Sequence, residues 1–293
     1  MRIANVKLAL GTAQFGLVYG IANQIGKVRR DEVARILNCA SGYGIDMLDT
    51  AITYGESECQ LGYSGVKDWK IVTKLPAIPN SCEDINAWVQ EEIASSLLKL
   101  NVGELYGVLL HSSDQLCGKK GIELYKALQA LKDKGETKKI GISIYSPSEL
   151  DILIPQYRFD LIQAPFNLID RRLQTSGWLE RLKYLDIEIH TRSTFLQGLL
   201  LMPLADIPMK FTNWNDIWNK WHNWLNNSSI KSIDACLAYP LSFPEIDRVI
   251  VGVESENQLQ QIISSAQKTT LNDFPDICSV DENLINPSRW ATL

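Results

Sequence analysis

The amino-acid sequence predicts an α/β fold in which eight parallel strands, each followed by a helix, close into a (β/α)8 or TIM barrel. Short runs rich in Val, Ile and Leu alternate along the chain with longer segments whose apolar residues recur at helical spacing. Such alternation is typical of parallel strands joined by right-handed crossovers. Eight repeats of the pattern favour closure into a barrel over an open sheet. Because no linker rich in Pro, Gly or Ser interrupts it, residues 1–293 are expected to form a single domain.

The strands and helices are assigned from this alternation in chain order. For example, GIELYKALQALKDKG has apolar residues at helical spacing and ends in a Gly suited to a helix C-terminal cap. The strands are expected at residues 6–11, 45–49, 70–74, 106–111, 139–143, 160–164, 187–193 and 248–252. The helices are expected at residues 30–43, 56–64, 83–100, 120–134, 147–154, 172–184, 230–239 and 256–267.

One connection is longer than the others and rich in tryptophan. Residues 201–229 follow the seventh expected strand and include NDIWNKWHNWLNN, which predicts a helix with an aromatic stripe. Two roles are open for this segment. It either packs on the barrel rim or forms a wall of the substrate pocket, because it leaves the barrel at the face that carries chemistry in this fold.

Composition narrows the class of protein. The net charge of -5 is spread along the chain without a basic stripe, which argues against a nucleic-acid partner. No apolar run reaches membrane-spanning length, and MRIANVKLALG lacks the pattern of a signal peptide. The six cysteines have no CxxC spacing and the three histidines have no metal-ligand spacing, so no metal is expected. These features together predict a cytoplasmic enzyme.

Four polar residues lie at or just after the ends of consecutive expected strands. Asp49 closes GIDMLD, Tyr54 follows in DTAITYGESE, Lys74 closes KIVTK, and His111 closes YGVLLH. In a barrel of this kind the carboxyl ends of the strands share one open face, where the catalytic residues of such enzymes are found. We therefore expect these four side chains to meet.

A phenol, an ammonium, a carboxylate and an imidazole form a set suited to proton transfer. The pKa of a free tyrosine is about 10, and a nearby ammonium lowers it by stabilising the phenolate. Lys74 is expected to act in this way on Tyr54, with Asp49 holding Lys74 in place. His111 is expected to orient a carbonyl oxygen beside the Tyr54 hydroxyl. The set contains no source of hydride, so reduction of a carbonyl requires a cofactor.

The segments that carry these residues resemble the aldo-keto reductases. The similarity lies in GTAQFG, DMLDTAITYGESE, IVTKL and VLLHSSD, and it continues through KKIGISIYS, LIQAPFNLID, RSTFLQGLL and VIVGVESENQL. The resemblance implies reduction of an aldehyde or ketone, with Asp49, Tyr54, Lys74 and His111 as the catalytic set. It also implies a nicotinamide cofactor bound across the strand ends, and no GxGxxG follows the first strand.

The resemblance also implies contacts with the cofactor. Ser143 and Gln163 match residues that bind the nicotinamide carboxamide, but Ile144 stands where the family often has Asn. Arg192 stands where many members place an aromatic ring against the nicotinamide, and a guanidinium can also stack on a ring. The other candidate contacts are Gly11, Thr12, Ala13, Ser193, Leu196, Gly198, Gly252, Glu254 and Gln258.

Glu254 bears on the form of the cofactor. It stands where many members of the resembled family have a Lys or Arg that holds the 2′-phosphate of NADP(H). A carboxylate repels that phosphate and accepts a hydrogen bond from the 2′-hydroxyl of NAD(H), unless the side chain points to solvent. The helix expected after Ser255 attracts a phosphate through its free N–H groups. The resemblance favours NADP(H), with NAD(H) as the alternative.

Two other functions are compatible with the same residues. A Schiff-base lyase would use Lys74 as its nucleophile. A nicotinamide-binding sensor or accessory subunit would keep the four residues without efficient turnover. The substrate expected for the reductase is a small carbonyl compound, which includes sugar-sized ones. The sequence leaves the physiological substrate and the oligomeric state open.

Overall fold

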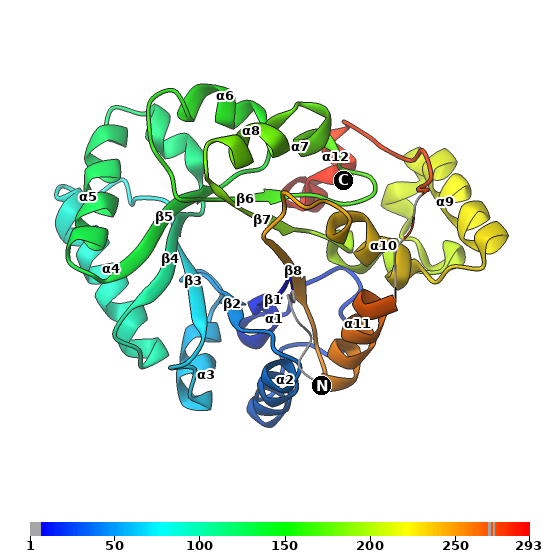
Figure 1. Cartoon of the computed structure of the whole chain (residues 1–293), viewed down its shortest axis with the longest axis horizontal. Helices are drawn as coiled ribbons and strands as arrows, with labels where there is room; N and C mark the ends of the chain where they lie inside the picture. The colour runs from blue at the N-terminus through cyan, green and yellow to red at the C-terminus, as the bar shows by residue number, and fades with distance from the viewer. Residues whose placement is uncertain (1–6, 269–270, 272) are drawn as a thin grey trace.

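The computed structural model describes residues 7–268, 271 and 273–293 (Figure 1). Its eight strands are all parallel and close into one barrel in chain order, which confirms the predicted (β/α)8 fold. The first strand was expected from residue 6, which lies outside the described residues. The strands are β1 (Leu8–Gly11), β2 (Met47–Asp49), β3 (Lys70–Leu75), β4 (Leu105–Leu110), β5 (Thr137–Ser143), β6 (Leu161–Pro165), β7 (Glu188–Arg192) and β8 (Arg248–Gly252).

Helices surround the barrel on its outer side (Figure 1). The prediction of one helix over 172–184 was wrong, because the chain breaks at Gly177, whose φ of 76° lies in the left-handed region that glycine tolerates best. The helices are α1 (Ala13–Gly16), α2 (Arg30–Gly42), α3 (Ser57–Ser64), α4 (Ile85–Leu100), α5 (Gly121–Asp133), α6 (Ser148–Leu153), α7 (Arg172–Thr175), α8 (Trp178–Tyr184), α9 (Asn215–Ser228), α10 (Ser232–Leu241), α11 (Glu256–Lys268) and α12 (Glu282–Ile285). None of the helices in the described part of the chain is long and apolar enough to cross a bilayer.

The barrel interior contains a small apolar layer that fixes where the polar residues lie. Six buried side chains from six strands pack together there: Ala9, Met47, Val72, Leu109, Leu161 and Ile250. Side chains along a strand alternate between two faces, so the residue two positions further on also points inward, one layer closer to the carboxyl end. These next residues are Gly11, Asp49, Lys74, His111, Gln163 and Gly252. Strand periodicity therefore brings the predicted site residues into one layer.

The tryptophan-rich helix α9 packs against the turns that precede it. In α9, Trp218 and Trp221 are buried, and their indole N–H groups donate to the backbone carbonyls of Phe211 at 2.9 Å and Leu200 at 3.2 Å. Burial of two large aromatic rings anchors this helix to the 3-10 turns at Leu196–Leu201 and Met209–Trp214 that precede it. Leu201, the first residue of the segment, lines the cavity that also contains Asp49, Tyr54 and His111, so both roles considered for residues 201–229 stay open.

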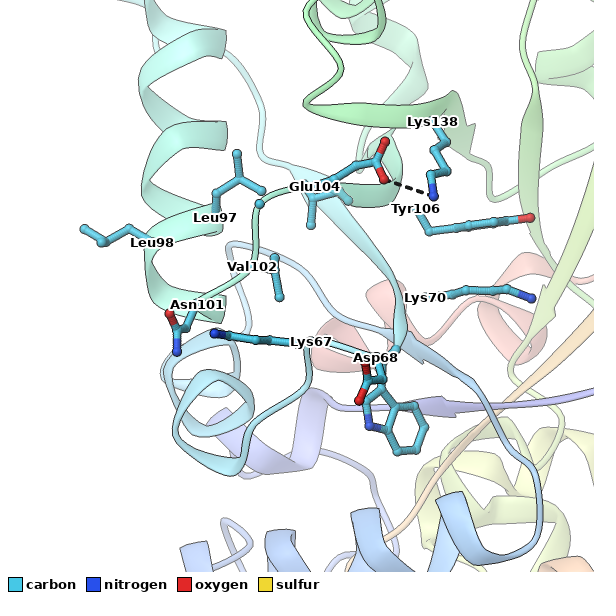
Figure 2. Close-up of a pocket in the computed structure, with 13 residues that line it drawn as sticks. Lys67, Asp68, Lys70, Leu97, Leu98, Asn101, Val102, Glu104, Tyr106 and Lys138 are labelled. Atoms are coloured by element: carbon cyan, nitrogen blue, oxygen red, sulfur yellow. Dashed lines mark ion pairs between the residues drawn. The ribbon is translucent and has the colours of Figure 1, made fainter.

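A cavity of about 890 Å³ opens at the amino-terminal end of the barrel, near the starts of β3 and β4 (Figure 2). Its walls include Lys67, Lys70, Leu98 and Tyr106, and Figure 2 shows the ion pair between Lys138 and Glu104 at its edge. It lies at the opposite end of the strands from the four predicted catalytic residues. Its side chains therefore take no part in their chemistry.

Candidate active site

The four predicted catalytic residues meet at the carboxyl ends of the strands. Asp49 is the last residue of β2, Lys74 lies one residue before the end of β3, and His111 directly follows β4. Tyr54 lies in the turn between β2 and α3, where the backbone N–H of Tyr54 donates to Ala51. Three neighbouring strands and one turn thus carry the set.

Lys74 and Asp49 form a buried ion pair beneath the open face. Lys74 Nζ donates to Asp49 Oδ2 at 2.6 Å and to the backbone carbonyl of Thr50 at 2.9 Å. Only 1% of Lys74 and 5% of Asp49 is exposed. The other carboxylate oxygen, Oδ1, accepts from Gln163 Nε2 at 2.6 Å. Because a buried charge is costly unless it is paired and hydrogen-bonded, this pair fixes both side chains.

Tyr54 lies over this pair and beside His111. Lys74 Nζ lies 5.2 Å from the centre of the Tyr54 ring, and the centres of the Tyr54 and His111 rings are 5.8 Å apart at an interplanar angle of 78°. Burial, and then the negative charge of Asp49, raise the pKa of the Tyr54 phenol above its usual value. The pKa is therefore raised overall, because burial of the phenol outweighs the lowering effect expected of Lys74. The phenol keeps its proton at neutral pH.

His111 is neutral at neutral pH. Burial lowers its pKa to about 4, and the positive charges of Lys74 and Arg192 act in the same direction. The hydroxyl oxygen of Thr53 lies 3.2 Å from His111 Nδ1. Sequence reasoning missed Thr53, although its position directly before Tyr54 in the same turn gave a signal. Contact at Nδ1 leaves Nε2 of the imidazole for another partner.

The four residues Asp49, Tyr54, Lys74 and His111 are called the tetrad below. A cavity of about 660 Å³ extends from the tetrad to the start of α11. This volume is within the range of small-molecule and cofactor sites. Its walls include Asp49, Tyr54 and His111, and all of the predicted cofactor contacts except Leu196, which is fully buried. Lys74 lies behind Asp49 rather than on the wall.

Two glycines in the wall of this cavity allow close packing against their neighbours. A Cβ atom on Gly252 would lie 2.7 Å from the side chain of Gln14, and one on Gly198 would lie 2.5 Å from Ala22.

Near the tetrad, Ser143 Oγ donates to Gln163 Oε1 at 3.4 Å, and Gln163 Nε2 in turn donates to Asp49. The amide that is expected to bind a carboxamide is therefore joined to the catalytic set. These residues fit a nicotinamide dinucleotide.

Comparison with known proteins agrees with this geometry. The sequence model of the aldo/keto reductase family matches residues 7–281. This chain belongs to the aldo/keto reductase family. Its relatives include the uncharacterized oxidoreductase YqkF of Bacillus subtilis, 23% identical over 291 residues, or 91% of this chain and 93% of YqkF. The aldo-keto reductase YhdN of the same organism is 26% identical over 151 residues, which cover 48% of this chain and 45% of YhdN.

Solved structures share the fold of this aldo/keto reductase. The holo form of the aldo-keto reductase AKR11C1 from Bacillus halodurans matches with a TM-score of 0.74 and 20% identity, over 91% of this chain and 88% of that one. The putative aldo-keto reductase PA4992 from Pseudomonas aeruginosa matches with a TM-score of 0.66 and 23% identity, over 90% of each chain. Membership of this family makes the protein a carbonyl-reducing oxidoreductase that acts on a small-molecule carbonyl compound. The family generally binds nicotinamide cofactors.

Two departures from the family pattern lie side by side in this aldo/keto reductase. Ile144, at the position often occupied by Asn, is fully buried in the hydrophobic core and does not reach the cavity. Arg192 places its guanidinium carbon 4.7 Å from the centre of the Tyr145 ring. Its Nη2 donates to the carbonyl of Ile144 at 2.9 Å, and its Nη1 donates to Ser193 Oγ at 3.3 Å. Arg192 is thus held in place by neutral partners.

The far end of the cavity carries negative charge. Glu254 lies on the wall, its backbone N–H donates to Gln258 Oε1 at 2.7 Å, and burial raises the pKa of its carboxyl. Nearby, Glu32 of α2 accepts from the backbone N–H of Glu256 at 2.6 Å. That N–H belongs to the first residue of α11, so a carboxylate of the protein already occupies part of this helix N-terminus. Glu32 also pairs with Arg35, which brings a cation to the same region.

Proposed function

We propose that this aldo/keto reductase reduces an aldehyde or ketone with Tyr54 as the general acid. The observation that carries the proposal is the position of the Tyr54 ring, between a buried Lys74–Asp49 pair and a neutral His111, on the wall of a cavity of cofactor size. A nicotinamide cofactor, when bound, supplies the hydride that reaches the carbonyl carbon. The residues of the chain supply the proton and the orientation.

Each residue has a role that follows from its contacts. Tyr54, which is protonated at neutral pH, donates its proton to the carbonyl oxygen as negative charge develops there. Lys74 then stabilises the phenolate, and Asp49 holds Lys74. Neutral His111 donates from Nε2 to the same carbonyl oxygen, because Thr53 contacts Nδ1 and fixes the ring. Thr53 is therefore a positioning residue in this proposal.

We also propose that the cofactor lies along the cavity between the tetrad and α11. Ser143 and Gln163 are placed to bind the carboxamide, and the backbone around Ser193 and Gly198 follows the pyrophosphate. The resemblance favours NADP(H). The carboxylates of Glu254 and Glu32 support NAD(H) as the alternative, because both repel a 2′-phosphate.

The Schiff-base alternative is weaker. Lys74 Nζ already donates to Asp49 and to the Thr50 carbonyl, and only 1% of Lys74 is exposed. A nucleophilic lysine needs a neutral amine that reaches the substrate. Borohydride treatment in the presence of carbonyl substrates is therefore expected to leave Lys74 unmodified.

One titration and one assay test the proposal. The purified protein is titrated with NADPH and with NADH while the fluorescence of its eight tryptophans is recorded. The same protein is then assayed for cofactor oxidation with a panel of aldehydes, ketones and sugars. We expect saturable binding of at least one cofactor and turnover of carbonyl compounds. Binding without turnover would favour the sensor, and absence of binding would overturn the proposal.

A further inference from the structure

Arg192 is a positively charged residue on the wall of the cavity that also contains Tyr54 and His111. Among the described residues that line this cavity, it has the only guanidinium or ammonium group. We propose that Arg192 binds an anionic group of the substrate, so that the preferred substrate is a carbonyl compound bearing a carboxylate or a phosphate. This inference rests on the proposed reductase function and names the substrate class of the same site.

The charge of Arg192 is not neutralised by the protein around it. Its three contacts are the Tyr145 ring, the Ile144 carbonyl and the Ser193 hydroxyl, all of them neutral. The nearest catalytic carboxylate, Asp49, is already occupied by Lys74 and Gln163. The Lys74–Asp49 pair carries no net charge and His111 is neutral, so the described wall at this end is left with the positive charge of Arg192.

Arg192 is also prepared to bind an anion. A guanidinium has five N–H donors in a rigid fork, and the two hydrogen bonds that Arg192 donates to Ser193 and Ile144 use one hydrogen from each terminal nitrogen. Three donors remain for a planar anion such as a carboxylate. The stacked Tyr145 ring and the carbonyl of Ile144 hold the fork in one orientation, which lowers the entropic cost of binding.

The guanidinium lies within electrostatic reach of the reacting groups. Its positive charge acts to lower the pKa of both Tyr54 and His111, although burial dominates in each case. Arg192, Tyr54 and His111 also line the same cavity, so an anion bound at Arg192 would place a carbonyl group of the same molecule in the space that Tyr54 and His111 line. Binding energy from a remote group of this kind is used to position the reacting carbon.

A matched pair of aldehydes tests the inference. 4-Formylbenzoate and 4-formylbenzamide have nearly the same shape and differ in charge. Their affinities are measured by isothermal titration calorimetry with protein saturated with the oxidised cofactor, which has no hydride to transfer to the aldehyde. A charge-assisted hydrogen bond predicts that the wild-type protein binds the benzoate about tenfold to hundredfold more tightly than the benzamide. In Arg192→Met this preference is expected to disappear, and in Arg192→Lys it is expected to survive in part.

A second arginine provides the control. Arg30 stacks on Tyr63 at 4.1 Å outside the cavity, so Arg30→Met removes a tyrosine-stacked guanidinium without touching the site. It should keep the wild-type preference. Equal or undetectable binding of the two aldehydes by the wild-type protein would overturn the inference, as would an unchanged preference in Arg192→Met. A loss of cofactor affinity in Arg192→Met with the preference intact would instead assign Arg192 to the cofactor.

The outcome separates this inference from the proposed function. Turnover of both aldehydes without a charge preference would refute the anionic substrate and leave the reductase standing. A charge preference that depends on Arg192, together with an absence of turnover, would refute the reductase and leave the anion site standing.

Discussion

Lys74 Nζ and Asp49 Oδ2 are 2.6 Å apart inside the barrel, although the two residues are separated by 25 positions in the chain. The register of the sheet explains the contact. Asp49 pairs with Val72 across β2 and β3, so Lys74 lies two residues further along and points to the same side as Val72. Both charges are almost fully buried, which makes each of them dependent on the other.

Lys74→Met is expected to reduce both stability and activity. The change leaves Asp49 buried without its partner, which typically costs about 3–5 kcal/mol in the free energy of unfolding. It also removes the cation that stabilises the Tyr54 phenolate, so the pKa of Tyr54 should rise further. Urea denaturation and the pH–rate profile of carbonyl reduction measure the two effects. An unchanged pH–rate profile would exclude Lys74 as the residue that tunes Tyr54.

Lys132→Met is the control for this change. Lys132 pairs with Asp160 at 2.7 Å, but about a third of each side chain is exposed. A partly exposed pair of this kind contributes about 0–1 kcal/mol. The control should therefore lose little stability and no activity.

Tyr54→Phe is expected to remove the proton donor while keeping the ring. Carbonyl reduction should fall by roughly a hundredfold or more, which is the contribution of a general acid. Cofactor affinity should change little, because the phenyl ring still occupies the same place. Tyr125→Phe, which removes a hydroxyl that donates to Arg158 outside the cavity, should keep full activity. Near-normal turnover by Tyr54→Phe would contradict the assigned mechanism.

The sequence predicted the barrel because each strand and helix leaves a local signal. Apolar runs and helical spacing recur in order, and a strand of known direction places residues such as Asp49 and His111 at a known face. The break at Gly177 within a helical pattern was not visible, since glycine is tolerated within a helix as well as at its ends.

The contacts between residues of the site required the structure. The approach of Thr53 to His111 depends on the path of a turn, and the bond from Glu32 to α11 joins parts of the chain 224 residues apart. The sequence suggested only the lowering effect of Lys74 on the pKa of Tyr54, because a list of residues does not contain the burial of the phenol, which is the largest cause of the upward shift. Burial and pairing are properties of the fold.

The neutral state of His111 predicts how stability depends on pH. Its pKa is about 4 in the folded protein and about 6.5 in an unfolded chain, so between these values the unfolded state binds more protons. Stability is therefore lost as the pH falls from 6.5 towards 4. His111→Gln removes this linkage. Between pH 7 and pH 5 the variant should lose about 1–2 kcal/mol less unfolding free energy than the wild type, as measured by urea denaturation. Equal losses would mean that His111 is not buried as described.

Glu254→Lys tests which form of the cofactor the protein prefers. Glu254 lies on the cavity wall, near the start of α11, where a 2′-phosphate is expected. The change replaces repulsion of that phosphate with attraction, so affinity for NADPH relative to NADH should rise by about 1–3 kcal/mol, less at high salt because the site is partly exposed. Fluorescence titrations with both cofactors at two ionic strengths measure the effect.

Glu123→Lys is the control, because it makes the same charge change on α5, away from the cavity, and should leave the ratio of the two affinities as it is. If Glu254→Lys also left the ratio unchanged, the adenosine ribose would lie elsewhere, and the Glu32–Arg35 pair at the start of α11 would be the next site to test.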